Sequence, residues 1–234
     1  MRTFREDLKK AVEFHGHLCS GQCIGIKMAH MGMEALGLDT LSVQGATRFS
    51  RPALVQFRAP ERWTSSANSR VGNVKMGQSR PFQTYSPLYT KGNETDGKKI
   101  LVFVECNRCP ADSILISTGC RIGRRTYVFK DFGKVAATFV NLKTQEAIRI
   151  RQVKHCYPQP GEDMLAYFEN LPYDAFLAAQ RVRVSLGAGD MPGPPVSVAV
   201  CARCGEEVMD LRHVEKDGQC LCKSCAGAGY YQAL

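Results

Sequence analysis

Four cysteines near the C-terminal end of the sequence stand in two C-x-x-C pairs, Cys201 with Cys204 and Cys222 with Cys225. The two-residue gap forms a tight turn that aims both sulfurs at one point, and zinc prefers four thiolates in a tetrahedron. Gly205 tolerates the left-handed backbone that such a turn often needs. The spacing therefore predicts a structural zinc site in a zinc ribbon, with a hairpin over 207–214 that links the pairs.

This tail of about forty residues is too short to bury enough apolar surface to fold alone, so metal binding substitutes for a core. A structural role is our first interpretation. Nucleic-acid binding is the alternative, and it has only a modest charge to support it, from Arg203, Arg212 and Lys223. Cys220 lies two residues before Cys222 and competes with it as a ligand, which the sequence leaves open. We interpret His213 as a solvated hairpin residue.

A second group of metal-binding side chains lies in the segment Phe14-His15-Gly16-His17-Leu18-Cys19. In an extended conformation residues 15, 17 and 19 point to one side, so two imidazoles and a thiol share a face. Cys19 also directly precedes a predicted helix, whose free N–H groups stabilise a thiolate. Two further cysteines flank another predicted helix, Cys109 before its Pro110 and Cys120 after Gly119.

We hypothesise a mixed site from His15, His17, Cys19 and one or both of Cys109 and Cys120. Such soft and borderline ligands suit zinc, iron or nickel, and do not suit magnesium or calcium. The alternative is that these thiols are inert core residues. Cys106 and Cys109 also make a C-x-x-C pair, which leaves a redox dithiol as a further alternative.

The same segments resemble the FmdE family, whose members are related to a component of formylmethanofuran dehydrogenase. The matching pieces are the run from Phe14 to Cys19, the strand Leu101-Val-Phe-Val-Glu105 that leads to Cys109-Pro-Ala-Asp112, and Thr118-Gly-Cys120. The resemblance implies an α+β domain, often paired as a homodimer, with a metal at the His/Cys site. It carries the family pattern onto His15, His17, Cys19, Cys109, Asp112 and Cys120. A proline usually follows the first cysteine, whereas this chain has Ser20.

The elements that position these groups follow from hydrophobic periodicity. We expect helices over 4–14, 20–36 and 109–117, strands over 100–105, 126–129, 135–140 and 146–152, and helices over 162–170 and 173–181. Gly21, Gly25 and Gly32 in the second helix indicate close approach by another backbone. The fold class is therefore α+β, a mixed helix and antiparallel-sheet domain over 1–184, then a linker over 185–195 and a zinc ribbon over 196–234.

Composition narrows the class of protein. The net charge is +9, but five of these charges come from the polar stretch 42–96, which has eight basic and three acidic residues. We interpret that stretch as an insertion. No run approaches 18 apolar residues and the start lacks a signal-peptide pattern, so we expect a cytoplasmic protein without a membrane span.

The resemblance points to an accessory role, because carbon dioxide reduction by formylmethanofuran dehydrogenase belongs to other subunits with a molybdenum or tungsten pterin. This chain has no ferredoxin-type C-x-x-C-x-x-C run and no recognisable pterin-binding signature. We expect a metal-binding accessory protein associated with a molybdenum or tungsten oxidoreductase. The alternatives are a stand-alone metal or thiol enzyme and a zinc-ribbon nucleic-acid-binding regulator.

Overall fold

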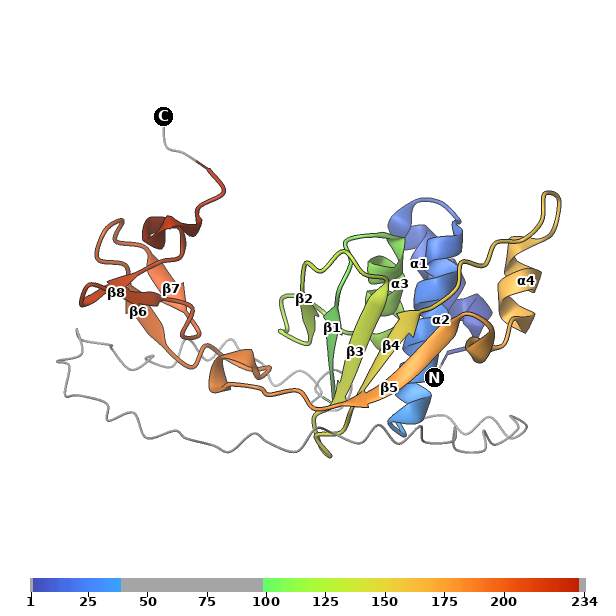
Figure 1. The fold of residues 1–234 in the computed structure, drawn as a ribbon, viewed down its shortest axis with the longest axis horizontal. Helices are drawn as coiled ribbons and strands as arrows, with labels where there is room; N and C mark the ends of the chain where they lie inside the picture. Colours follow the sequence, from blue (N-terminus) through green and yellow to red (C-terminus); the bar gives the residue numbers. More distant parts are fainter. Residues whose placement is uncertain (1, 39–98, 232–234) are drawn as a thin grey trace.

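The computed structural model describes residues 2–38 and 99–231, so the insertion predicted over 42–96 lies outside the described residues. The α+β class is confirmed (Figure 1). The helices are α1 Phe4–His15, α2 Ser20–Ala35, α3 Cys109–Thr118 and α4 Met164–Asn170. The strands of the larger sheet are β1 Ile100–Val104, β2 Tyr127–Phe129, β3 Ala136–Asn141, β4 Ala147–Gln152 and β5 Leu177–Val182. No helix in the described ranges combines the length and apolar character that a membrane crossing needs.

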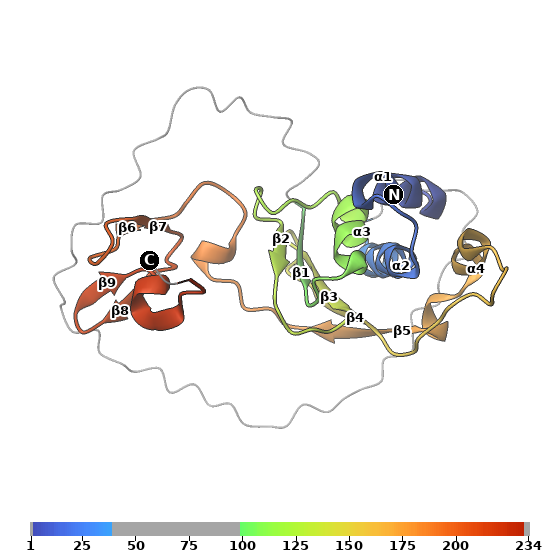
Figure 2. The same cartoon turned by 90° about the horizontal axis from the view of Figure 1, so that it is seen from above.

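The five strands lie in the order β2-β1-β3-β4-β5, with β1 and β2 parallel and the other neighbours antiparallel. Helices α1, α2 and α3 lie on one face of this sheet (Figure 2). The main apolar core fills the space between them and includes Ile26 and Met28 from α2 and Phe139 from β3, all fully buried. The three helices pack on this face of the sheet, and this packing fixes the positions of their ends.

Helix α1 begins with a capping box. The side chain of Thr3 accepts from the backbone N–H of Glu6, whose carboxylate accepts from the backbone N–H of Thr3. The helix ends at Gly16, which has a φ of 94° and donates its N–H to the carbonyl of Val12. This left-handed turn suits glycine, and it leads the chain directly to Cys19 at the start of α2.

A buried ionic group fixes α1 on α2. Asp7 is fully buried, and its carboxylate lies 2.8 Å from Nε2 of His30 and forms an ion pair with Arg2. His30 is thus a hydrogen-bonded histidine of the core. The carboxylate satisfies an imidazole that burial would otherwise leave without a partner.

Close packing between α2 and α3 depends on glycine, as the sequence predicts. A Cβ on Gly21 would lie 2.9 Å from the Cβ of Cys109, and one on Gly25 would lie 2.5 Å from the carbonyl oxygen of Pro110. Both distances are shorter than ordinary contact, so only glycine allows the two helices to approach this closely. The approach brings the N-terminal end of α2, with Cys19, to the N-terminal end of α3, with Cys109.

The helix predicted over 173–181 is wrong. Residues Tyr173–Ala175 form a single 3₁₀ turn, and the chain continues as β5, which pairs with β4 over its whole length. The Ala178-Ala179-Gln180 run favours a helix by intrinsic propensity, but the open edge of β4 offers backbone hydrogen bonds that outweigh it. The burial of Phe176 and Leu177 fixes this placement.

The C-terminal strands differ from the single hairpin predicted over 207–214. They are β6 Val198–Val200, β7 Glu207–Met209, β8 Val214–Lys216 and β9 Gln219–Leu221, paired as β6 with β7 and β8 with β9. Asp210 and Leu211 both have a φ of 58°, so the chain turns away after β7 and does not fold back. Cys201 follows β6 directly and Cys222 follows β9 directly, so each cysteine pair begins where a strand ends.

Candidate metal centres

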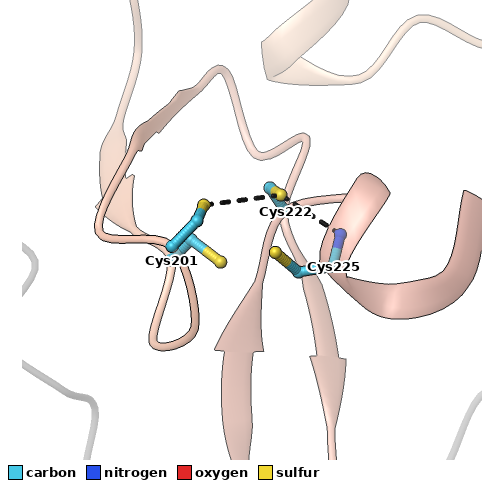
Figure 3. A group of neighbouring side chains, drawn as sticks. Cys201, Cys222 and Cys225 are labelled. Atoms are coloured by element: carbon cyan, nitrogen blue, oxygen red, sulfur yellow. Dashed lines mark hydrogen bonds between the residues drawn. The ribbon is translucent and has the colours of Figure 1, made fainter. Parts of the chain in front are cut away.

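The four cysteines of the C-terminal pairs form one group. Their sulfur atoms all lie within 4.8 Å of one another, and Sγ of Cys204 is 3.9 Å from Sγ of Cys222. Four zinc–sulfur bonds of about 2.3 Å in a tetrahedron place neighbouring sulfurs roughly 3.8 Å apart. Figure 3 shows the side chains of Cys201, Cys222 and Cys225 converging on one region. The arrangement is therefore consistent with a zinc ribbon and can hold a metal ion.

Electrostatics in this group also favour a cation. Backbone N–H groups of Cys204 and Cys222 lower the pKa of the Cys201 thiol to about 6. A hydrogen bond with the thiol of Cys222, together with burial, raises the pKa of Cys225 to about 12. Sulfurs this close cannot all carry a negative charge on their own, because like charges disfavour ionisation. A bound cation would remove that conflict and allow four thiolates.

The side chains of His15, His17 and Cys19 form a second group, with ligand atoms that all lie within 4.8 Å of one another. The two imidazole rings are 4.7 Å apart between their centroids. His15 belongs to the last turn of α1, while Cys19 is the residue directly before α2. The loop turned by Gly16 therefore brings together three potential ligands separated by only four positions in the sequence.

Asp112 of α3 orients His15. Its Oδ2 lies 2.8 Å from Nδ1 of His15, so the ring keeps Nε2 for another partner. That Nε2 atom is buried and has no hydrogen-bond partner within the described residues. A carboxylate that holds one histidine nitrogen while the other binds an ion is the usual support for a metal ligand. His17 remains exposed, so one side of the group is open to solvent.

Cys109 lies beside this group without joining it. Burial and the neighbouring thiol of Cys19 raise the pKa of Cys109. Its sulfur is nevertheless not among the atoms that lie within 4.8 Å of one another. Cys106, its partner in the C-x-x-C pair, is buried, and that burial raises the pKa of its thiol. The structure therefore brings Cys109 near the second group and leaves Cys106 in the core.

Cys120 is not brought to the second group. Its side chain is buried, and its sulfur lies 3.9 Å from the carbonyl oxygen of Ile100 in β1. Helix α3 has ten residues, and a rise of 1.5 Å per residue separates its ends by about 15 Å. Cys109 and Cys120 lie at opposite ends of that helix.

A third group was missed from the sequence. His213, Glu215 and Cys220 also offer ligand atoms within 4.8 Å of one another. Cys220 is not part of the four-cysteine group, which contains Cys222. The signal that would have found this group is the register of a short hairpin, in which Glu215 lies opposite Cys220.

Comparison with known proteins shows the family of the chain. A family model described as "FmdE, Molybdenum formylmethanofuran dehydrogenase operon" matches residues 14–50 and 84–171, more than half of the sequence. The chain belongs to the FmdE family. The second candidate group and its supporting Asp112 lie within the ranges that the FmdE model matches, whereas the four-cysteine group lies outside them.

Two individual relatives are similar to this FmdE chain. A "Probable S-adenosyl-L-methionine-binding protein" of Archaeoglobus fulgidus is 23% identical, over 95% of this chain and 53% of that protein. The chain thus spans about half the length of this curated relative. An FmdE-like protein from Syntrophus aciditrophicus, described by its likeness to a component of tungsten formylmethanofuran dehydrogenase, has a crystal structure with 15% identity and a TM-score of 0.47. That match covers 98% of this chain and 95% of the other.

Proposed function

We propose that this chain is a metal-binding accessory protein of a molybdenum or tungsten oxidoreductase. The observation that carries the proposal is the group of His15, His17 and Cys19, in which Asp112 holds one nitrogen of His15 and leaves the other buried and unpartnered among the described residues. A buried polar atom without a partner is costly, and an ion at that position would satisfy it. Membership of the FmdE family supports the link to such an enzyme.

The two candidate centres would hold different ions for different reasons. Four thiolates in a short C-terminal unit suit a structural zinc ion, which substitutes for an apolar core. Two imidazoles and one thiolate suit zinc, iron or nickel. With three protein ligands and an exposed His17, the second centre would keep a coordination position for water or a partner's side chain. An ion held in this way can be transferred or shared.

The proposal also covers the domains of the chain, its oligomeric state and its place among other subunits. We propose a metal-binding domain over 1–184, a linker over 185–195 and a zinc ribbon over 196–234, in a cytoplasmic homodimer. The enzyme's redox chemistry would belong to other subunits, because the sequence contains no C-x-x-C-x-x-C run of the ferredoxin type. The role of this chain would then be assembly, metal delivery or stability of the complex.

Association can be tested directly. Purified chain is immobilised under anaerobic, metal-replete conditions, and subunits of candidate molybdenum and tungsten dehydrogenases are passed over it. We expect retention of one subunit, weakened by His17→Ala and unchanged by His155→Ala, which alters an exposed histidine outside the candidate centres. Absence of retention for every candidate would contradict the accessory role.

A stand-alone metal enzyme is the second candidate, and the exposed position of His17 is the observation that favours it. An ion with an open position can lower the pKa of bound water or polarise a small substrate. Incubation of the metal-loaded chain with panels of esters, amides and small oxidised substrates distinguishes a stand-alone enzyme from an accessory protein. Turnover that disappears in Cys19→Ala would favour the enzyme, and retention of a dehydrogenase subunit without turnover would favour the accessory protein.

A further inference from the structure

The hairpin formed by β8 and β9 carries a group of side chains that neither candidate centre uses. His213, Glu215 and Cys220 each offer one ligand atom, and these atoms lie within 4.8 Å of one another. Nitrogen, carboxylate oxygen and thiolate are all ligands of zinc. The group lies in the C-terminal unit, but it shares no residue with the four-cysteine group.

The geometry of the hairpin explains why these three side chains meet. Glu215 pairs with Cys220 across the ladder, so their side chains project from the same face. His213 precedes Glu215 by two residues and therefore shares that face. The connecting residues Asp217 and Gly218 have φ values of 52° and 73°, the positive pair of a tight two-residue turn. Such a turn fixes which residues of β8 and β9 are paired, and this pairing brings the three side chains together.

The imidazole of His213 faces Glu215 through Nε2, while its Nδ1 atom is buried and has no hydrogen-bond partner in the part of the chain that the structure describes. Its Nε2 lies 3.5 Å from Oε1 of Glu215, which is longer than a good hydrogen bond. Two ligands with bonds of about 2.0–2.1 Å to one tetrahedral zinc ion would lie roughly 3.3–3.4 Å apart. The observed separation is close to that value.

We propose that His213, Glu215 and Cys220 bind a divalent transition-metal ion of the zinc type, in addition to any ion held by the four cysteines. Three protein ligands leave a fourth position for water or a small anionic or thiol ligand. The side chain of Glu215 is 65% exposed and that of His213 is 22% exposed, so the ion would be reachable from solvent. The C-terminal unit would thus carry one closed and one open metal site.

Metal content of the full-length chain tests this site. Reduced protein is loaded anaerobically with excess zinc, desalted, and analysed for zinc per chain by mass spectrometry. We expect one fewer equivalent in Glu215→Gln and in His213→Ala than in the wild type. The matched control Glu207→Gln removes an exposed carboxylate from β7 and should retain the wild-type content.

Cobalt substitution assigns the lost equivalent. The four-cysteine site gives strong sulfur-to-cobalt charge-transfer absorption, which should persist in both variants and shows that the C-terminal unit is folded. Glu215→Gln is the decisive variant because its exposed side chain contributes little to packing. The proposal is overturned if Glu215→Gln holds as much zinc as the wild type and gives the same cobalt spectrum, whatever His213→Ala does.

Discussion

Gly25 of α2 faces α3 with no space for a side chain. A Cβ built there would lie 2.1 Å from Oγ of Ser113, and 2.5 Å and 2.7 Å from the carbonyl oxygen and Cα of Pro110. The hydroxyl of Ser113 can rotate away, but the backbone of Pro110 cannot. To restore ordinary contact, the Gly25→Ala variant must move the two helices apart by roughly 0.7–0.9 Å.

Overpacking of this kind costs about 3 kcal/mol at the upper end of its usual range, and the better helix propensity of alanine offsets about 1 kcal/mol. We therefore expect Gly25→Ala to lower the free energy of unfolding by about 2 kcal/mol, measured by denaturant titration. Asp112 lies on α3, so the shift also loosens its hold on His15. Loss of such support lowers metal affinity by about 10- to 100-fold, measured by chelator competition.

Gly32→Ala is the matched control for this prediction. It lies on the same helix, and its added Cβ would lie 2.4 Å from the ring of Phe139 in β3. This variant should also lose stability, but it should keep the wild-type metal affinity because α3 need not move. If Gly25→Ala matches the wild type in both stability and metal affinity, the role assigned to the α2–α3 contact is wrong.

Three further predictions follow from single contacts. Asp112→Ala should lower the affinity of the second centre by about 10- to 100-fold without changing the circular dichroism spectrum, and unchanged affinity would remove Asp112 from the site. Burial opposes ionisation of Asp7, but its bonds to His30 and Arg2 outweigh that effect and hold its pKa below the ordinary 3.8. The stabilisation that the ionised Asp7 carboxylate contributes is therefore complete above about pH 4. It is lost as the pH falls through the lower pKa that Asp7 has in the folded protein. The free energy of unfolding of Asp7→Asn should be about 3 kcal/mol lower than that of the wild type at pH 7. The difference between the two proteins should shrink below about pH 4, whereas a constant difference would show that charge is not involved. Cys204→Ser should make residues 196–231 sensitive to protease while the described residues 99–184 resist. Resistance of both would show that the tail folds without metal.

The sequence was sufficient for features that local chemistry determines. The spacing of Cys201, Cys204, Cys222 and Cys225 predicts their convergence because each pair is closed by its own turn. The sequence also predicts that His15, His17 and Cys19 meet, but through an extended conformation. In the structure they meet because His15 ends α1 and the left-handed Gly16 turns the chain. Gly21 and Gly25 of α2 correctly predict close helix packing because a glycine in a helix interior needs a packing reason, whereas the atoms nearest to a Cβ on Gly32 belong to the ring of Phe139 and not to a backbone.

Features that depend on distant pairing could not be predicted in this way. The Ala178-Ala179 segment is a strand only because β4 offers an unpaired edge. Cys120 lies at the C-terminal end of α3, beside Ile100 of β1, so the length of α3 separates it from Cys109 and the second group. The group of His213, Glu215 and Cys220 depends on a register that the sequence alone does not fix.

Metal content of the anaerobically purified chain, compared with that of His17→Ala and Cys19→Ala, tests the second centre most directly. Both variants should lose one equivalent of a transition metal relative to the wild type and keep the zinc of the four cysteines. His155→Ala should lose none. If His17→Ala and Cys19→Ala retain every equivalent that the wild type holds, the proposed N-terminal metal centre does not exist.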